Sequence, residues 1–391
     1  MSVHSSTKLP YSSLAGELAD LDTQGLRRER KVLDSAQSAH VTVDGREYTA
    51  FCSNDYLGLA NHPELIEAAC EGAARFGVGS GASHLVLGHS RAHHELEHAL
   101  AAFVQLPRAL LFSTGYMANI GIVTALTGRE DAVFADRLNH ASLNDACLLS
   151  RAKFKRYAHS DLDMLARLLA QTPARRKLVV TDAVFSMDGD IALVRELLAL
   201  CEMHDAWLVL DDAHGFGVLG ASGRGVLEHF DLRTPRIIYM ATLGKAAGVF
   251  GAFVAGDEVL IETLIQRARS YIYTTAMPPL VACALLKSLA VIADEGWRRE
   301  TLRKRIMQLK QVLTSESSRL IPSDTAIQPL IVGGNREALA LAAKLAAKGI
   351  LVPAIRPPTV PQGSARLRIS LSAAHTADDV QRLASALKAA Q

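Results

Sequence analysis

Residues 207–215 read WLVLDDAHG, and this short stretch decides the fold that we expect. Its first four residues, Trp207–Leu210, are apolar, which is typical of a strand covered on both faces of a sheet. Two carboxylates and a histidine, Asp211, Asp212 and His214, follow directly. Ligands of parallel sheets bind beyond the carboxyl ends of the strands. The stretch therefore predicts a parallel sheet with a polar ligand site at the end of this strand.

Similar short apolar runs lie on either side of this stretch, and longer amphipathic segments separate them. We expect the further strands at Ala109–Phe112, Asp131–Ala135, Lys177–Thr181, Arg236–Met240 and Val249–Ala255. The segments between them predict helices at Tyr116–Leu126, Ala141–Ser150, Leu162–Leu169 and Leu193–His204. Regular alternation of strand and helix predicts an α/β fold with a mainly parallel central sheet and helices on both faces.

The pattern divides the chain into three parts. Residues 1–52 read as an N-terminal arm that ends in a hairpin turning at Asp44-Gly45. Residues 53–277 hold the strand–helix alternation and form a large ligand-binding domain. Residues 278–391 open with two long helical segments and continue with short strands and two more helices, which predicts a small α+β C-terminal domain.

Composition excludes several classes of protein. The 391 residues include 42 Lys and Arg against 40 Asp and Glu, so the net charge of +2 provides no general field for nucleic acid. The five cysteines are scattered with no CxxC pair, which argues against a disulfide framework or a structural zinc cluster. Residues 109–128 carry no charge but are too polar for a membrane span. We see no signal peptide and expect a cytoplasmic enzyme.

Two motifs suggest chemistry that the surrounding residues do not favour. Residues 94–98, HELEH, match the zinc protease pattern HExxH, yet His94 and His98 project roughly opposite the apolar stripe of their helix. We therefore expect both histidines in solvent and no metal site. Residues 215–220, GFGVLG, match GxGxxG, but Asp211 and Asp212 would repel a phosphate there and no long helix follows. A glycine-rich surface turn is favoured.

Lys245 and one helix start complete a constellation with Asp211. Lys245 lies among small residues after the strand Arg236–Met240, where desolvation would lower its pKa toward that of a nucleophilic amine. Residues 113–119, STGYMAN, open a helix whose free N–H groups can bind an anion. Alone, each feature has an ordinary explanation: a capping acid, a surface lysine and a capped helix. Together they suit one ligand, pyridoxal 5′-phosphate (PLP), which needs a lysine and an acidic partner for its ring nitrogen.

The same residues resemble a specific family, the α-oxoamine synthases among the fold-type I PLP-dependent transferases. The resemblance covers essentially the whole chain. The motifs that carry it are SNDYLG at 53–58, GVGSG at 77–81, NHAS at 139–142, FSMDGD at 185–190, DDAHG at 211–215, TLGK at 242–245 and SAAHT at 372–376. The segment after Gly81 departs from the commoner family forms at Ala82, His84 and His89.

The resemblance implies a role for each matched residue. Lys245 bonds the cofactor and moves protons, Asp211 holds the ring nitrogen proton, His214 bonds the ring hydroxyl and His140 stacks on the ring. The remaining cofactor contacts implied by the family are Gly115, Tyr116, Ser186 and Thr242. For the substrate, the resemblance implies Arg27, His140, Arg356 and Thr359, with Arg356 on the amino-acid carboxylate and Arg28 an alternative to Arg27.

Two stretches near the C-terminus indicate the substrate within this family. Residues 326–333, AIQPLIVG, and 354–361, AIRPPTVP, resemble members that condense L-alanine with pimeloyl-CoA or pimeloyl-ACP. A sibling synthase such as glycine C-acetyltransferase is the alternative reading, followed by a zinc protease and a non-catalytic relative. The resemblance also implies a homodimer, with the segment Tyr273-Thr274-Thr275 near the partner's phosphate.

Overall fold

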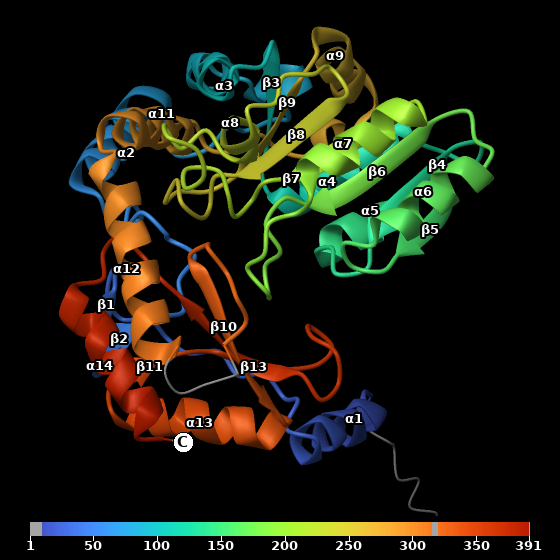
Figure 1. Cartoon of the computed structure of the whole chain (residues 1–391). Helices are drawn as coiled ribbons and strands as arrows, with labels where there is room; N and C mark the ends of the chain where they lie inside the picture. Colours follow the sequence, from blue (N-terminus) through green and yellow to red (C-terminus); the bar gives the residue numbers. More distant parts are fainter. Residues whose placement is uncertain (1–9, 315–319, 391) are drawn as a thin grey trace, which may run out of the picture.

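A large sheet forms the centre of the molecule in the computed structural model, which describes residues 10–314 and 320–390 (Figure 1). Its seven strands run in the order β3-β9-β8-β7-β6-β4-β5. Only β9 is antiparallel to its neighbours within this sheet. Their bounds are β3 Arg108–Phe112, β4 Ala132–Asp136, β5 Lys153–Tyr157, β6 Lys177–Asp182, β7 Ala206–Asp211, β8 Ile237–Thr242 and β9 Ala252–Gly256. The predicted α/β fold with a mainly parallel sheet is confirmed.

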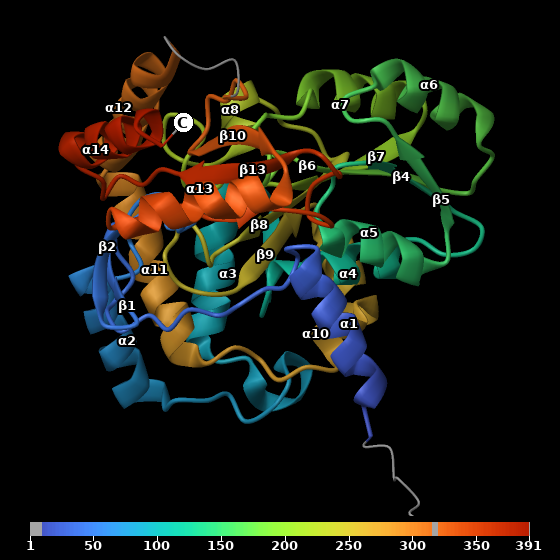
Figure 2. The same ribbon diagram turned by 90° about the horizontal axis from the view of Figure 1, so that it is seen from below.

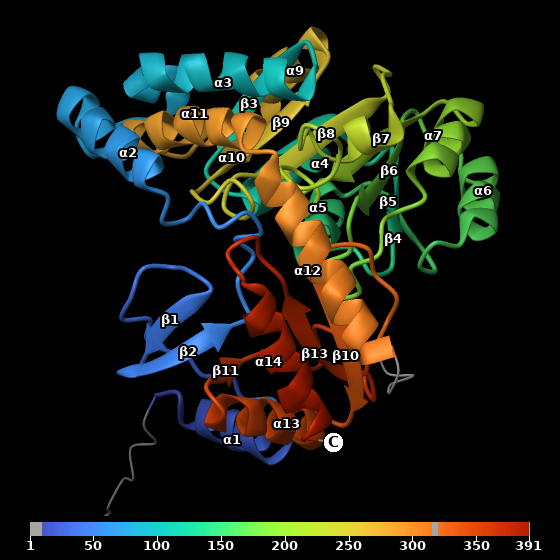
Figure 3. The same ribbon diagram turned by 60° about the vertical axis from the view of Figure 1, so that its left-hand side comes forward.

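Both faces of the sheet are buried, because its strands alternate between two hydrophobic cores. In β8, Tyr239 and Ala241 belong to one core and Ile238 and Met240 to the other. Helices cover each face: α3 Arg91–Val104, α6 Leu162–Gln171, α7 Val194–Met203 and α11 Pro279–Asp294 on the first, and α4 Gly115–Leu126, α5 Ala141–Ser150 and α9 Glu258–Arg267 on the second. The result is a three-layer arrangement, seen from the side in Figure 3.

The edge strand β5 is the one strand of this sheet that the sequence pattern missed. Lys153, Lys155 and Arg156 are exposed there, so the strand contains no apolar run. It is recognised only by its parallel pairing with β4, in which Ala132 faces Lys153. A charged edge strand of this kind also discourages pairing with other sheets.

The C-terminal part lies below the large sheet and is joined to it by the helix α12, Trp297–Thr314 (Figure 1). A three-stranded antiparallel sheet of β10 Ile327–Gly333, β13 Ala365–Ser370 and β12 Ala354–Ile355 packs with α13 Asn335–Ala347, and α14 Ala377–Lys388 packs with α12. The N-terminal hairpin, β1 His40–Val43 and β2 Arg46–Ala50, pairs with β11 Ile350–Leu351 of this part. Figure 2 shows from below how α1, Ser12–Thr23, and α13 belong to the same end of the molecule.

The remaining elements connect these layers. The helix α2, Pro63–Phe76, packs on α11, and the short η1 segment, His84–Gly88, leads into α3. Two short helices, α8 Val226–Phe230 and α10 Arg269–Ile272, follow β7 and α9. The GxGxxG segment 215–220 forms turns rather than a strand–helix junction, as the sequence predicts, but its predicted surface position is wrong: residues 215–217 are buried, because Phe216 packs into the main core at 1% exposure. In the described residues no helix has both the length and the apolar character that a membrane crossing requires.

Candidate active site

A cavity of about 180 Å³ opens where the carboxyl ends of five strands meet. Short connections after β3, β4, β6, β7 and β8 carry its polar lining. All eight residues that the sequence analysis assigned to the cofactor line this one cavity: Gly115, Tyr116, His140, Ser186, Asp211, His214, Thr242 and Lys245. Strand order alone brings them together, because they span 131 positions of the sequence.

Lys245 begins a chain of hydrogen bonds that runs from this cavity into the protein. Its Nζ lies 2.8 Å from Nε2 of His214, and His214 Nδ1 lies 2.6 Å from the hydroxyl of Tyr56. Tyr56 in turn donates to the Asn54 side chain at 3.1 Å. Burial lowers the pKa of Lys245 to about 8, although Asp211 and Asp182 act in the opposite direction. A substantial fraction of the Lys245 amine is therefore unprotonated and nucleophilic at mildly alkaline pH.

Carboxylates surround this amine in the floor of the cavity. Asp211 ends β7, and its two oxygens accept hydrogen bonds from the Ala213 N–H at 3.0 Å and from Asn119 at 2.7 Å. Burial, together with the charge of Asp211, raises the pKa of Asp182 well above its usual value. Burial also lowers the pKa of His214 well below its usual value, so this ring is neutral.

The start of α4 lies at the cavity, where the sequence predicts an anion site. Thr114 caps the helix by accepting the N–H of Met117 at 3.1 Å. The N–H groups of Gly115 and Tyr116 keep no backbone partner among the described residues. Free N–H groups at the positive end of a helix bind phosphate. An amine, a carboxylate and a phosphate-binding helix start around one cavity fit the three parts of PLP.

Comparisons with known proteins agree with this geometry. Residues 46–387 match the model of the family "Aminotransferase class I and II". The chain is 67% identical over 365 residues to an 8-amino-7-oxononanoate synthase of Nitrosospira multiformis, with 93% of this chain and 92% of the relative covered. It is 66% identical to the synthase of Nitrosomonas europaea, with 96% and 98% covered. The chain belongs to the 8-amino-7-oxononanoate synthase family.

Solved structures of this family and of a sibling synthase share the fold. Serine palmitoyltransferase from S. paucimobilis, solved with bound PLP, superposes with a TM-score of 0.92 at 30% identity, covering 97% of both chains. The 8-amino-7-oxononanoate synthase of Francisella tularensis gives a TM-score of 0.77 at 32% identity, covering 88% of this chain and 97% of that one. The predicted family, fold-type I architecture and PLP dependence of this 8-amino-7-oxononanoate synthase family member are confirmed.

Of the four predicted substrate residues, His140 lines the cavity, whereas Arg27, Arg356 and Thr359 are not part of its lining. Arg356 donates to the carbonyl oxygen of Gly25, and Arg28 lies 3.4 Å from the Thr359 hydroxyl. Arg27 instead forms an ion pair with Asp22 at 2.7 Å. The structure thus joins Arg356 and Thr359 to the segment around Arg28, and it turns Arg27 away from them.

Arg368 is a residue near the site to which the sequence analysis gave no role. It is only 5% exposed, and its Nε donates to the Ser186 carbonyl at 2.5 Å. Its neighbour in the strand, Arg366, forms an ion pair with Asp188, but Arg368 has no carboxylate partner in the described part of the chain. A buried, unneutralised guanidinium is costly without an anion. The signal was visible in the sequence as two arginines inside the apolar strand ARLRIS.

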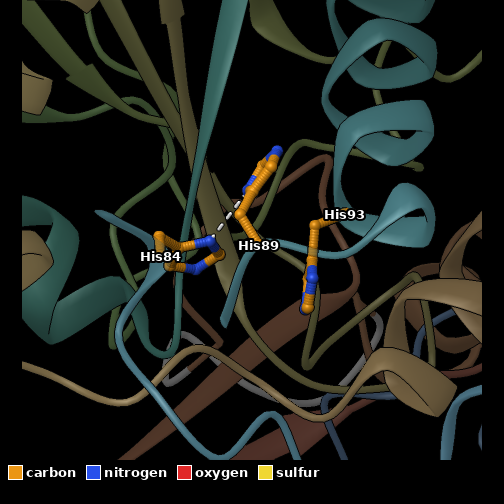
Figure 4. Close-up of side chains that lie close together, drawn as sticks. All are labelled: His84, His89 and His93. Atoms are coloured by element: carbon orange, nitrogen blue, oxygen red, sulfur yellow. Dashed lines mark hydrogen bonds between the residues drawn. The ribbon is translucent and has the colours of Figure 1, made fainter. Parts of the chain in front are cut away.

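Five histidines of the η1–α3 region form a separate group. Figure 4 shows His84, His89 and His93 close together, with His84 Nδ1 and His89 Nδ1 3.0 Å apart. His93 has no free nitrogen for a metal, because Ser90 N–H donates to its Nδ1 at 3.0 Å and its Nε2 donates to the Met277 carbonyl at 2.7 Å. Two remaining rings fall short of the three or four protein ligands of zinc sites. His94 and His98 of the HExxH motif are exposed, as the sequence predicts.

Proposed function

We propose that the protein condenses L-alanine with a pimeloyl thioester, using PLP, and releases carbon dioxide, the carrier thiol and 8-amino-7-oxononanoate. The α-carbon of alanine gains a bond to the acyl carbon, while the thioester C–S bond and the bond from the α-carbon to its carboxylate break. The observation that carries this proposal is the Lys245 amine, held in one cavity with Asp211 and the start of α4, in a chain of this family.

The cofactor and the protein divide the chemistry. PLP, when bound, supplies an electron-poor ring that stabilises negative charge at the α-carbon of an attached amino acid. Lys245 is placed to take and return the proton at that carbon, because its lowered pKa suits general base catalysis near neutral pH. Asp211 holds the proton on the ring nitrogen, and neutral His214 orients the Lys245 amine through their 2.8 Å contact.

Different residues bind the cofactor phosphate and the alanine carboxylate in this proposal. The free N–H groups of Gly115 and Tyr116, with Ser186 and Thr242, hold the cofactor. Arg356 receives the alanine carboxylate, a bidentate task that suits arginine. Thr359, with Arg27 or Arg28, lines the path of the acyl chain. The geometry favours Arg28, which already contacts Thr359.

Arg368 supports this assignment by adding positive charge next to the cavity. Its guanidinium contacts Asn54 at 3.1 Å and lies behind Ser186, which lines the cavity. Replacement of either Arg356 or Arg368 by lysine should raise the KM for alanine. An unchanged KM in Arg356→Lys would remove Arg356 from the substrate site.

We propose a homodimer as the working form. Leu85, Val86 and Leu87 of η1 and Tyr273 after α10 are 51%, 76%, 86% and 71% exposed in the single chain. Such apolar exposure is typical of a surface that a partner covers, and the segment of Tyr273 is the one that the family resemblance directs to the partner's phosphate. Light scattering on the purified protein tests this expectation.

A cytoplasmic location fits the five unpaired cysteines.

Assays with a panel of amino acids and thioesters test the proposed reaction. We expect turnover with L-alanine and pimeloyl-CoA or pimeloyl-ACP, with the carrier thiol and carbon dioxide released in equal amounts. Turnover with glycine and acetyl-CoA, but none with alanine and either pimeloyl thioester, would instead identify a sibling synthase. Comparison of the two pimeloyl donors at equal concentration identifies the carrier.

A further inference from the structure

A chain of hydrogen bonds through buried Asn119 and Ser142 links His140 to Asp211 beside the cavity. Asn119 of α4 is fully buried, and its Nδ2 lies 2.7 Å from Asp211 Oδ2 and 2.9 Å from Ser142 Oγ. An amide nitrogen carries two hydrogens and accepts none, so Asn119 donates to both oxygens. The flipped amide would set its carbonyl oxygen against the Asp211 carboxylate, which excludes that orientation.

The direction of the next bond follows from the backbone at the start of α5. The N–H of Ser142 donates to Nδ1 of His140 at 3.3 Å, so this nitrogen is an acceptor and carries no proton. The hydroxyl of Ser142, 1% exposed, lies 2.7 Å from the same Nδ1 and therefore donates to it as well, while its oxygen accepts from Asn119. Although His140 is exposed to the cavity, the protein around it partly desolvates the ring and lowers its pKa, with Asp211 acting in the opposite direction.

We propose that Asn119 and Ser142 are positioning residues that hold His140 as the neutral tautomer with its proton on Nε2. This nitrogen has no hydrogen-bond partner among the described residues, and the ring lines the cavity. His140 therefore presents a fixed, uncharged N–H donor to the cavity. A donor of this kind can orient the alanine carboxylate, which must later leave as carbon dioxide, by adding one directional hydrogen bond to the charged contact assigned to Arg356. This catalytic consequence rests on the proposed function, but the tautomer does not.

Nitrogen-15 NMR of the histidine rings tests the tautomer directly. The full-length, deuterated protein carries label in its 14 histidines, and His140→Gln identifies the His140 signals. Spectra are recorded with and without PLP. We expect the form protonated at Nε2 to exceed the other tautomer at least about tenfold, since each hydrogen bond contributes roughly 1 kcal/mol. A wild-type ring with its neutral proton on Nδ1 would overturn the proposal.

Variants of Ser142 identify the residue responsible. Ser142→Ala removes the hydroxyl donor, so the fraction protonated at Nδ1 should rise several-fold and kcat/KM for alanine should fall about tenfold. Ser142→Thr keeps the hydroxyl and should restore both. Ser150→Ala is the matched control, because Ser150 is a buried serine of the same helix whose hydroxyl bonds Cys147 instead.

The outcomes separate this proposal from the proposed function. A tautomer unchanged in Ser142→Ala would refute the positioning role, whatever substrate the enzyme uses. The expected tautomer shift in a protein that does not turn over alanine would leave the positioning role intact and refute the substrate. Should Ser142→Ala fail to fold, the rings of the wild type and of Ser142→Thr still decide the tautomer.

Discussion

Two histidine-rich regions of this molecule look alike in the sequence and behave oppositely in the structure. In the first region, His214 and His140 line the cavity together with Lys245 and buried carboxylates. His214 contacts the Lys245 amine, and both rings face the cavity. In the η1–α3 region, the rings bond one another and the backbone. Burial lowers the pKa of His84 to about 3 and of His89 to about 4, so both rings are neutral.

The difference lies in what surrounds each ring rather than in the number of ligating atoms. In the functional site, donors of different kinds face one cavity: the Lys245 amine, which His214 contacts, and the His140 Nε2 and the N–H groups at the start of α4, which have no partner among the described residues. The η1–α3 group has more imidazoles, yet His93 closes a capping box at the start of α3 and is completely buried. These contacts give His93 a structural role, and the HExxH motif that begins at the next residue has both of its histidines exposed.

The largest expected effect comes from Lys245, the residue that separates the two regions most clearly. Lys245→Ala removes both the amine that bonds the cofactor and the proton carrier, so we expect activity to fall by roughly 10⁴-fold or more. Steady-state assays and the visible absorbance of the cofactor measure both losses. Lys155→Ala, an exposed lysine of β5, is the control and should match the wild type. Near-normal turnover in Lys245→Ala would show that the cavity is not the active site.

His93 tests the structural side of the comparison. Its two ring nitrogens each have a partner, and the ring is fully buried. His93→Leu leaves the Ser90 N–H without its partner and removes one of the two donors to the Met277 carbonyl, which keeps the Ser80 hydroxyl, so the free energy of unfolding should fall by about 1–3 kcal/mol. Urea denaturation measures this value, with the activity of the folded fraction largely kept. A loss of activity without a loss of stability would mean that His93 acts in catalysis after all.

His159 provides a third histidine environment, an ion-paired one. Its ring bonds Asp136 at 3.1 Å and Asp190 at 3.0 Å, and these bonds raise its pKa to about 10 against a usual value near 6.5. Because the folded pKa is the higher one, the stabilisation is complete below pH 6.5 and disappears as the pH rises through about 10. His159→Gln should therefore lose about 1–2 kcal/mol of unfolding free energy at pH 6 and almost none at pH 10. A loss that is constant with pH would disprove the ion pairs.

Much of the fold and of the site could be predicted from the sequence, because the residues that indicate them are neighbours in the chain. The apolar strand before Asp211 indicated the parallel sheet correctly, and the small residues around Lys245 led to the prediction of PLP, which the comparisons confirm. The chain from Asn119 through Ser142 could not be predicted, since it depends on how two neighbouring helices, α4 and α5, face each other. The two arginines of β13 were visible in the sequence, but only the fold shows that Arg366 has a carboxylate partner and that Arg368 has none among the described residues.

The smallest effect concerns the exposed pair of the HExxH motif. His94 and His98 lie on the solvent side of α3, with their Nε2 atoms 3.2 Å apart. His98→Gln removes this contact at an exposed site, so stability should change by less than about 0.5 kcal/mol and turnover should stay at the wild-type level. Dialysis against EDTA should leave activity unchanged as well, because none of the cavity residues depends on this pair. A chelator-sensitive activity that zinc restores, and that His98→Gln abolishes, would reverse the assignment of the two regions and make the helix α3 the catalytic one.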